Sequence, residues 1–140
     1  MTTLATVPAE APTSRPLRVL AVDDQSLFLD ALGIVLSAAS DLQIVGRASD
    51  GAEGLQLALS LRPDVVLMDV EMPRLDGFEA TRKITTALPE TAVVIVTGST
   101  LAGGAQRART AGAAGYVTKD QLATTLAASI RAAAAAVRGA

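Results

Sequence analysis

The chain contains no cysteine, histidine or tryptophan, and has only one tyrosine and two phenylalanines among its 140 residues. Without cysteine, disulfide bridges and thiolate metal sites are excluded, which fits a cytoplasmic location. Without histidine, the chain has no imidazole base, no imidazole metal ligand and no phosphohistidine of its own. Apolar residues make up 50% of the chain, and few of them are aromatic. We therefore expect an aliphatic core.

Strong charge and long hydrophobic runs are also missing. The net charge is −2 and no long basic stretch occurs, so we expect no direct binding to nucleic acid. The alanine-rich stretch 122–137 is interrupted by Arg131 and is weakly hydrophobic, which is typical of a soluble helix. The N-terminus lacks the basic and apolar blocks of a signal peptide. These features predict a cytoplasmic domain that does not bind membranes.

Four short apolar runs each end in a polar side chain suited to phosphate or metal chemistry. The runs are residues 18–22, 65–68, 92–96 and 115–118, and the residues that follow them are Asp23 with Asp24, Asp69, Thr97 and Lys119. Short β-branched runs that alternate with helical stretches are typical of parallel strands with helical crossovers. Ligands of such sheets bind outside the carboxyl ends of the strands. We therefore expect three carboxylates, one hydroxyl and one ammonium group to meet in one crevice.

The remaining pattern predicts five helices and one further strand. The strand is 44–48, and the helices are 26–39, one starting at Asp50, one from Asp76 to about Leu88, a short one near Gly103-Gly104, and 121–137. Asp50 with Glu53 and Asp76 with Glu79 have the spacing of helix caps. Leu55, Ala58 and Leu59 are expected to form the buried face of the second helix. Strict alternation of five strands and five helices predicts a three-layer α/β sandwich.

One domain accounts for most of the chain. Residues 1–16 contain three prolines and no periodicity, so we expect a flexible N-terminal tail. The domain should span 17–137, with 138–140 as its C-terminal end. Only 21 residues follow Lys119, too few for an output domain.

The acidic residues favour a metal site over simple helix caps. Two carboxylates about 4 Å apart repel by roughly 4 kcal/mol at an effective dielectric constant near 20. A cluster of Asp23, Asp24 and Asp69 therefore needs a cation, and oxygen ligands without histidine or cysteine favour Mg²⁺. Beside such an ion, Asp69 is a possible nucleophile for a phosphoryl group.

The other strand-end residues have a plain interpretation and a functional one. Lys119 is either a surface charge or the partner of Asp69 or of a phosphoryl group. Thr97 either caps the next helix or donates to a phosphoryl oxygen, and Gly98 leaves the approach to Asp69 open. Tyr116 is either an ordinary core residue or a switch that rotates into space vacated when Thr97 moves.

Taken in order, these motifs resemble the receiver domain of bacterial two-component response regulators. The resemblance covers about residues 17–137 and rests on Asp23-Asp24, Asp69, Met72-Pro73 with Asp76-Gly77, Thr97 and Lys119. The stretches 69–81 and 115–120 are similar to the NarL-type branch of that family. The resemblance implies a (βα)5 flavodoxin-like three-layer sandwich whose parallel sheet has the order 2-1-3-4-5.

The resemblance also implies roles for individual residues. Asp69 would accept a phosphoryl group from a sensor histidine kinase, Asp24 would bind Mg²⁺ directly, and Asp23 would act mostly through water. The backbone carbonyl of Glu71 would be a further metal ligand. Lys119 would contact the phosphoryl group, and Thr97 with Tyr116 would form the switch pair.

The implied domain is a signalling module and not an enzyme, limited to self-phosphorylation and slow self-dephosphorylation. Its output would run through the face of the fourth helix, fifth strand and fifth helix, by a homodimer or a partner contact. NarL-type proteins usually continue into a helix-turn-helix DNA-binding domain, which is absent from this sequence.

Two other functions share parts of this pattern. A Mg²⁺-dependent phosphoryl-transfer enzyme of the haloacid-dehalogenase type also uses a strand-end aspartate, but it needs Asp-x-Asp after the first strand, where this chain has Asp23-Asp24. A flavodoxin-like cofactor binder needs a phosphate loop rich in Ser, Thr and Gly. Asp-Asp-Gln-Ser at 23–26 would repel phosphate unless a metal intervened.

Overall fold

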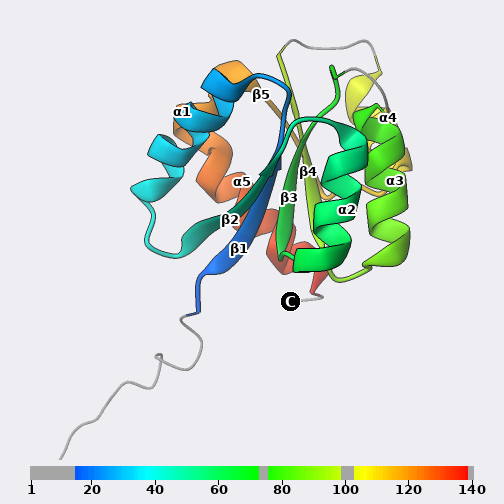
Figure 1. Cartoon of the computed structure of the whole chain (residues 1–140), viewed down its shortest axis with the longest axis horizontal. Helices are drawn as coiled ribbons and strands as arrows, with labels where there is room; N and C mark the ends of the chain where they lie inside the picture. Colours follow the sequence, from blue (N-terminus) through cyan, green and yellow to red (C-terminus); the bar gives the residue numbers. More distant parts are fainter. Residues whose placement is uncertain (1–14, 73–75, 99–102, 139–140) are drawn as a thin grey trace, which may run out of the picture.

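The structure, a computed structural model, describes residues 15–72, 76–98 and 103–138 (Figure 1). Most of the predicted tail, and Pro73 of the Met72-Pro73 motif, lie outside these residues. The described chain forms a five-stranded parallel sheet in the order β2-β1-β3-β4-β5, as predicted. The strands are β1 (Leu17–Val22), β2 (Leu42–Ala48), β3 (Val65–Asp69), β4 (Ala92–Thr97) and β5 (Gly115–Thr118).

Helices cover both faces of the sheet and complete the predicted three layers (Figure 1). The helices are α1 (Ser26–Ser37), α2 (Gly51–Leu61), α3 (Gly77–Ala87), α4 (Gly104–Thr110) and α5 (Leu122–Val137), with a 3-10 turn at Lys119–Gln121. One aliphatic core packs α1 and α5 on the sheet, and a second core lies under α2, α3 and α4. None of the described helices has the length and apolar character needed to cross a membrane.

The predicted helix caps form as the spacing indicated. The side chain of Asp50 accepts a hydrogen bond from the Glu53 N–H at 2.8 Å, and Asp76 accepts one from the Glu79 N–H at the same distance. Gly103 lies just before α4 with a φ of 70°, a conformation that glycine adopts without strain. These caps fix where α2, α3 and α4 leave the sheet.

The predicted buried face of α2 is partly wrong. Ala58 is buried, but Leu55 is only half-buried and Leu59 is 46% exposed. The helix lies so close to β1 that a Cβ atom on Gly54 would come within 2.9 Å of Val22. Small residues therefore face the sheet, and the leucines of α2 flank this contact. The bounds differ slightly elsewhere: α1 ends at Ser37 instead of 39, and β2 begins at Leu42 instead of 44.

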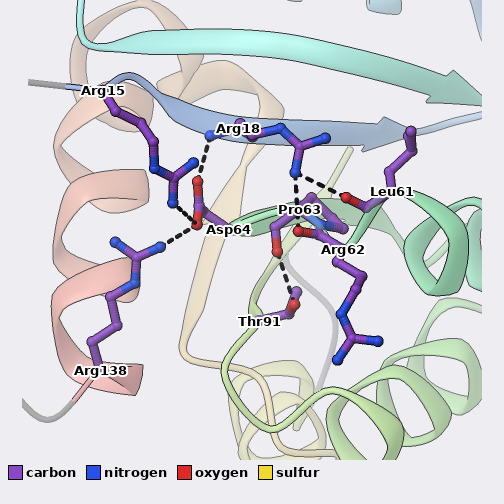
Figure 2. A network of polar contacts seen from close by, with 8 residues as sticks. All are labelled: Arg15, Arg18, Leu61, Arg62, Pro63, Asp64, Thr91 and Arg138. Atoms are coloured by element: carbon purple, nitrogen blue, oxygen red, sulfur yellow. Dashed lines mark hydrogen bonds and ion pairs between the residues drawn. The ribbon is translucent and has the colours of Figure 1, made fainter.

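A buried carboxylate joins both ends of the domain at the amino-terminal edge of the sheet (Figure 2). Asp64 accepts a hydrogen bond from the Arg18 backbone N–H at 2.8 Å and pairs with the guanidinium groups of Arg15 and Arg138. Arg15 precedes β1 and Arg138 follows α5, so Asp64 ties the first and last elements to β3. A cavity of about 450 Å³ lies beside this cluster. Asp69 lies at the opposite end of β3.

Candidate functional site

Three carboxylates meet at the carboxyl edge of the sheet. Asp23 and Asp24 follow β1, and Asp69 ends the neighbouring strand β3. One oxygen from each lies within 4.8 Å of the others. Asp23 and Asp69 are buried, whereas Asp24 is exposed. The pairing of Val22 with Met68 in the parallel register places these residues next to each other across 46 positions of sequence.

Backbone hydrogen bonds orient the two buried carboxylates. Oδ1 of Asp23 accepts from the Gln25 N–H at 2.8 Å, and Oδ1 of Asp69 accepts from the Glu71 N–H at 3.0 Å. Each contact spans two residues, so each carboxylate is held by the loop that follows its own strand. The Oδ2 atoms of both groups turn toward Lys119.

Lys119 lies at the end of β5 and reaches back to the first loop. Its Nζ atom is 2.7 Å from Oδ2 of Asp23 and 3.8 Å from Oδ2 of Asp69. It also donates to Oε1 of Gln25 at 2.9 Å and lies 4.1 Å from the ring centroid of Phe28. Lys119 therefore reaches the carboxylate cluster, but its close carboxylate contact is with Asp23 and not with Asp69.

The environment of Asp69 favours its neutral form. Burial raises the pKa of Asp69 from its ordinary value of 3.8 to about 6, with the negative charge of Asp23 adding to the increase. The Glu71 N–H and the Lys119 ammonium act in the opposite direction and offset only part of this effect. Asp69 at neutral pH is thus a poorly solvated carboxylate beside two others, with one ammonium for three negative charges.

The donor set fits a small, hard divalent cation. It consists of three carboxylates, one of them open to solvent, with no nitrogen or sulfur ligand. Mg²⁺ is commonly held by one or two carboxylates together with water and a phosphate oxygen. Glu71, whose backbone carbonyl was predicted as a further ligand, lies two residues beyond Asp69, and its side chain accepts from the Gly98 N–H at 3.3 Å. The chemistry of the cluster therefore matches the predicted metal.

Gly77 allows α3 to begin directly against the end of β3. A Cβ atom at this position would lie 2.3 Å from the backbone oxygen of Asp69 and 2.7 Å from Cα of Val70. Real Cβ atoms do not approach backbone this closely, so no other residue fits without displacing the helix. The Asp76-Gly77 pair thus combines a helix cap with the close approach that frames Asp69.

Thr97 and Tyr116 share one face of the sheet. Thr97 is fully buried at the end of β4 and pairs in register with Thr118. Tyr116 pairs with Ile95, two positions further from the edge, and packs against the core under α4. Among the described residues its buried hydroxyl finds no hydrogen-bond partner. A cavity of about 220 Å³ between α4 and β5 is lined partly by Tyr116, so the ring has space beside it.

Two contact residues of this site were not foreseen. Gln25 and Phe28 contact Lys119 from 94 and 91 positions away in the sequence. Their place directly after the acidic pair puts them near the site, but local spacing gives no signal of a contact with the fifth strand. The parallel topology alone brings the first and last loops together.

Comparison with known proteins points to one family. Residues 19–131 match the family model for the response regulator receiver domain. The chain is 42% identical over 118 residues to the uncharacterized transcriptional regulatory protein YxjL of Bacillus subtilis, covering 84% of this chain and 54% of that protein. It is 47% identical over 103 residues to the response regulator GacA of Pseudomonas viridiflava, covering 74% and 48%. The chain spans about half the length of these curated relatives.

A solved structure shows the same fold at similar identity. The signal receiver domain of the putative response regulator NarL from Mycobacterium tuberculosis superposes with a TM-score of 0.76 and 31% sequence identity. The match covers 90% of this chain and 99% of that structure.

Proposed function

Because the chain belongs to the response regulator receiver domain family, whose members are phosphorylation-controlled signalling receivers, we propose that Asp69 is its phosphoryl acceptor. One observation carries this assignment: a buried strand-end carboxylate with two further carboxylates within 4.8 Å and Lys119 within 3.8 Å. Asp23 is engaged by Lys119 at 2.7 Å, and Asp24 is exposed, so neither combines burial with a free approach.

The donor in this proposal is a phosphohistidine of a sensor histidine kinase. An oxygen of the Asp69 carboxylate attacks phosphorus, a P–O bond forms, and the P–N bond to the imidazole breaks. The imidazole leaves with the electron pair and is neutralised by a proton, so the phosphoryl group is transferred without net oxidation or loss of atoms. The chain itself contains no histidine, so the donor must be another protein or a small phosphodonor.

Mg²⁺ would be held by Asp24 directly, with Asp23, Asp69 and the Glu71 backbone carbonyl completing the protein's contribution. When bound, the ion neutralises charge that gathers on the phosphoryl oxygens. Asp23 would also keep Lys119 at the site, and Thr97 at the end of β4 would donate its hydroxyl to a phosphoryl oxygen. Asp69 must be ionised to attack, so the cation and Lys119 together would counter the effect of its burial.

The output in this proposal is a change on the face formed by α4, β5 and α5. Thr97 and Tyr116 lie on one face of adjacent strands, and the Tyr116 ring has a cavity beside it, which supports a linked movement of the two side chains. The readout would be a homodimer or a partner contact. Beryllofluoride with Mg²⁺, which mimics the phosphoryl group, should shift amide NMR signals from β4 through the start of α5. Shifts confined to the metal ligands would overturn this part.

Helix α1 is the surface that we propose for docking of the kinase. Leu27 and Ile34 are 82% and 74% exposed, and seven positions of helix bring them to one side. Leu27 lies three residues after Asp24 of the acidic cluster. A donor protein must reach Asp69 at this edge of the sheet, so exposed apolar residues that begin near it in the sequence support docking along α1.

The decisive experiment is phosphorylation with a small donor. Incubation with acetyl phosphate and Mg²⁺ should add one phosphoryl group, seen as a single mass increase of the intact protein. The Asp69→Asn variant should gain none, and Asp30→Asn, at an exposed position of α1, should behave as wild type. An unchanged mass increase in Asp69→Asn would overturn the assignment.

The haloacid-dehalogenase alternative gains no support, because the matched family is the receiver domain. The flavodoxin-like alternative shares only the fold. A cytoplasmic location, a non-enzymatic role for this domain and a lack of direct DNA binding remain our predictions.

A further inference from the structure

The side chains around Lys119 hold it away from the proposed acceptor. Its Nζ atom is 2.7 Å from Asp23, 2.9 Å from the Gln25 amide oxygen and 4.1 Å from the Phe28 ring centroid. The distance to Asp69 is 3.8 Å, beyond hydrogen-bonding range. The Lys119 ammonium donates a hydrogen bond to the Gln25 amide oxygen, forms an ion pair with Asp23 and lies over the Phe28 ring.

We propose that Gln25 and Phe28 are positioning residues that retain Lys119 in a resting position and so oppose its movement onto a phosphoryl group at Asp69. The inference rests on the proposed function, because it concerns the same acceptor. A phosphoryl group on Asp69 adds negative oxygens, and Lys119 must exchange its contacts with Gln25 and Phe28 for a contact with them. Contacts made in only one of two states shift the balance between those states. Gln25 and Phe28 therefore favour the unphosphorylated form.

The Gln25 side chain is well suited to a clean test. It makes no cap contact with α1, and its local hydrogen bonds come from its backbone: the N–H donates to Asp23, and the carbonyl accepts from Phe28 and Leu29. Replacement of Gln25 by methionine keeps the approximate length of the side chain and removes the amide group whose oxygen Lys119 contacts. The change leaves the three carboxylates in place.

The test is the affinity for beryllofluoride, formed from beryllium chloride and excess fluoride, at saturating Mg²⁺. Fluorescence reports on the site region without labels, because Tyr116 is the only tyrosine and the chain has no tryptophan. Gln25→Met should bind beryllofluoride about three- to tenfold more tightly than wild type, the size expected for losing one ordinary intramolecular hydrogen bond. Phe28→Leu should change affinity in the same direction. Gln56→Met, at an exposed position of α2, should match wild type.

A second measurement does not depend on beryllofluoride. Unfolding of metal-free Gln25→Met, Lys119→Met and the double variant should show a favourable interaction between the two side chains, and the ¹⁵N signal of the Lys119 amine should shift in Gln25→Met. An unchanged or weaker beryllofluoride affinity in Gln25→Met, or zero interaction in the metal-free cycle, would overturn the inference. If wild type binds no beryllofluoride, the proposed function fails, and the metal-free cycle still decides whether Gln25 holds Lys119.

Discussion

At the scale of single residues, Asp69 shows how the site works against the stability of the fold. The unfolded chain ionises this carboxyl near pH 3.8 and the folded chain only near 6, because burial disfavours the charge. Between these values the folded state binds more protons than the unfolded state. The contribution of Asp69 to the free energy of unfolding is therefore greatest below about pH 4. It decreases as the pH rises through about 6 and changes little above that.

Asp69→Asn should remove this loss, because an amide does not ionise. In metal-free buffer with chelator, the stability difference between variant and wild type should grow in favour of the variant from pH 4.5 to pH 7.5. We expect this growth to be on the order of 1–3 kcal/mol. Urea unfolding at both pH values measures the difference. Asp30→Asn, at an exposed site, serves as the control. Equal differences between variant and wild type at both pH values would contradict the electrostatic account.

Of the acidic pair, we expect Asp24 to contribute more to Mg²⁺ binding and Asp23 more to the contact with Lys119. Both oxygens of Asp23 have partners, Oδ1 with the Gln25 N–H and Oδ2 with Lys119, whereas Asp24 is exposed. Asp24→Ala should therefore weaken Mg²⁺ binding more than Asp23→Ala, by calorimetric titration. Without metal, Asp24→Asn should melt no lower than wild type, since it removes one of three repelling carboxylates. Unchanged Mg²⁺ affinity in Asp24→Ala would defeat this assignment.

At the scale of elements, two glycines test how closely helices must approach strands. Gly77→Ala would place a methyl group 2.3 Å from the Asp69 backbone oxygen, so α3 must move away from β3. We expect a loss of about 2–4 kcal/mol in unfolding free energy and weaker Mg²⁺ binding, because the loop carrying Glu71 moves too. Gly33→Ala in α1 is the matched control, with nothing within 4 Å of its added Cβ atom.

The control should gain stability, by roughly 0.5–1 kcal/mol, because alanine favours helix over glycine. Chemical unfolding of both variants measures the contrast. If Gly77→Ala were as stable as wild type, the close approach of α3 to the end of β3 would not constrain the site.

Substitutions on the exposed side of α1 should affect phosphoryl transfer from the kinase but not labelling by acetyl phosphate. Leu27→Asp with Ile34→Asp adds charge to this side without disturbing the core, because both side chains lie in solvent. Phosphoryl transfer from the kinase should slow at least tenfold, while labelling by acetyl phosphate should stay at the wild-type rate. The matched control is Leu59→Asp, on the exposed side of α2. An equal loss with both donors would show damage to the site and not to docking.

The elements were largely predictable because periodicity and caps are local. Asp50 with Glu53 and Asp76 with Glu79 marked helix starts within a few residues, and β-branched runs marked the strands. The burial of α2 was not predictable in the same way. It depends on how near Gly54 comes to Val22 on another element, so the larger Leu59 was wrongly expected inside.

The candidate site was also predictable only in part. Parallel topology places every strand end at one edge, so the meeting of Asp23, Asp69 and Lys119 followed from strand order alone. Which partner Lys119 prefers did not follow, because Gln25 and Phe28 compete for it from the first loop. Such choices depend on side-chain directions that no spacing encodes.

At the scale of the whole molecule, β3 has a cluster of charged residues at each of its two ends, and we call these clusters its poles. Asp69 at its carboxyl end lies among excess negative charge, whereas Asp64 before its first residue accepts from Arg18 and pairs with Arg15 and Arg138 (Figure 2). The functional pole is thus electrostatically costly without metal, and the other pole holds the ends of the domain together. The fold therefore needs the Asp64 cluster most when the carboxylates at the functional pole carry full charge.

Asp64→Ala should consequently destabilise the whole domain by about 2–4 kcal/mol, because it leaves the half-buried Arg18 N–H without an acceptor and frees two guanidinium groups. Asp41→Ala is the control, since it breaks the exposed pair between Asp41, just before β2, and Arg131 of α5, and exposed pairs add little stability. Urea unfolding measures the loss of unfolding free energy, and hydrogen exchange shows which elements become less protected. We expect faster exchange in β1 and at the end of α5, with Mg²⁺ affinity unchanged because the proposed metal ligands lie at the other end of β3. A loss of Mg²⁺ affinity in Asp64→Ala would mean that the two poles are not independent, and that β3 transmits strain from one end of the sheet to the other.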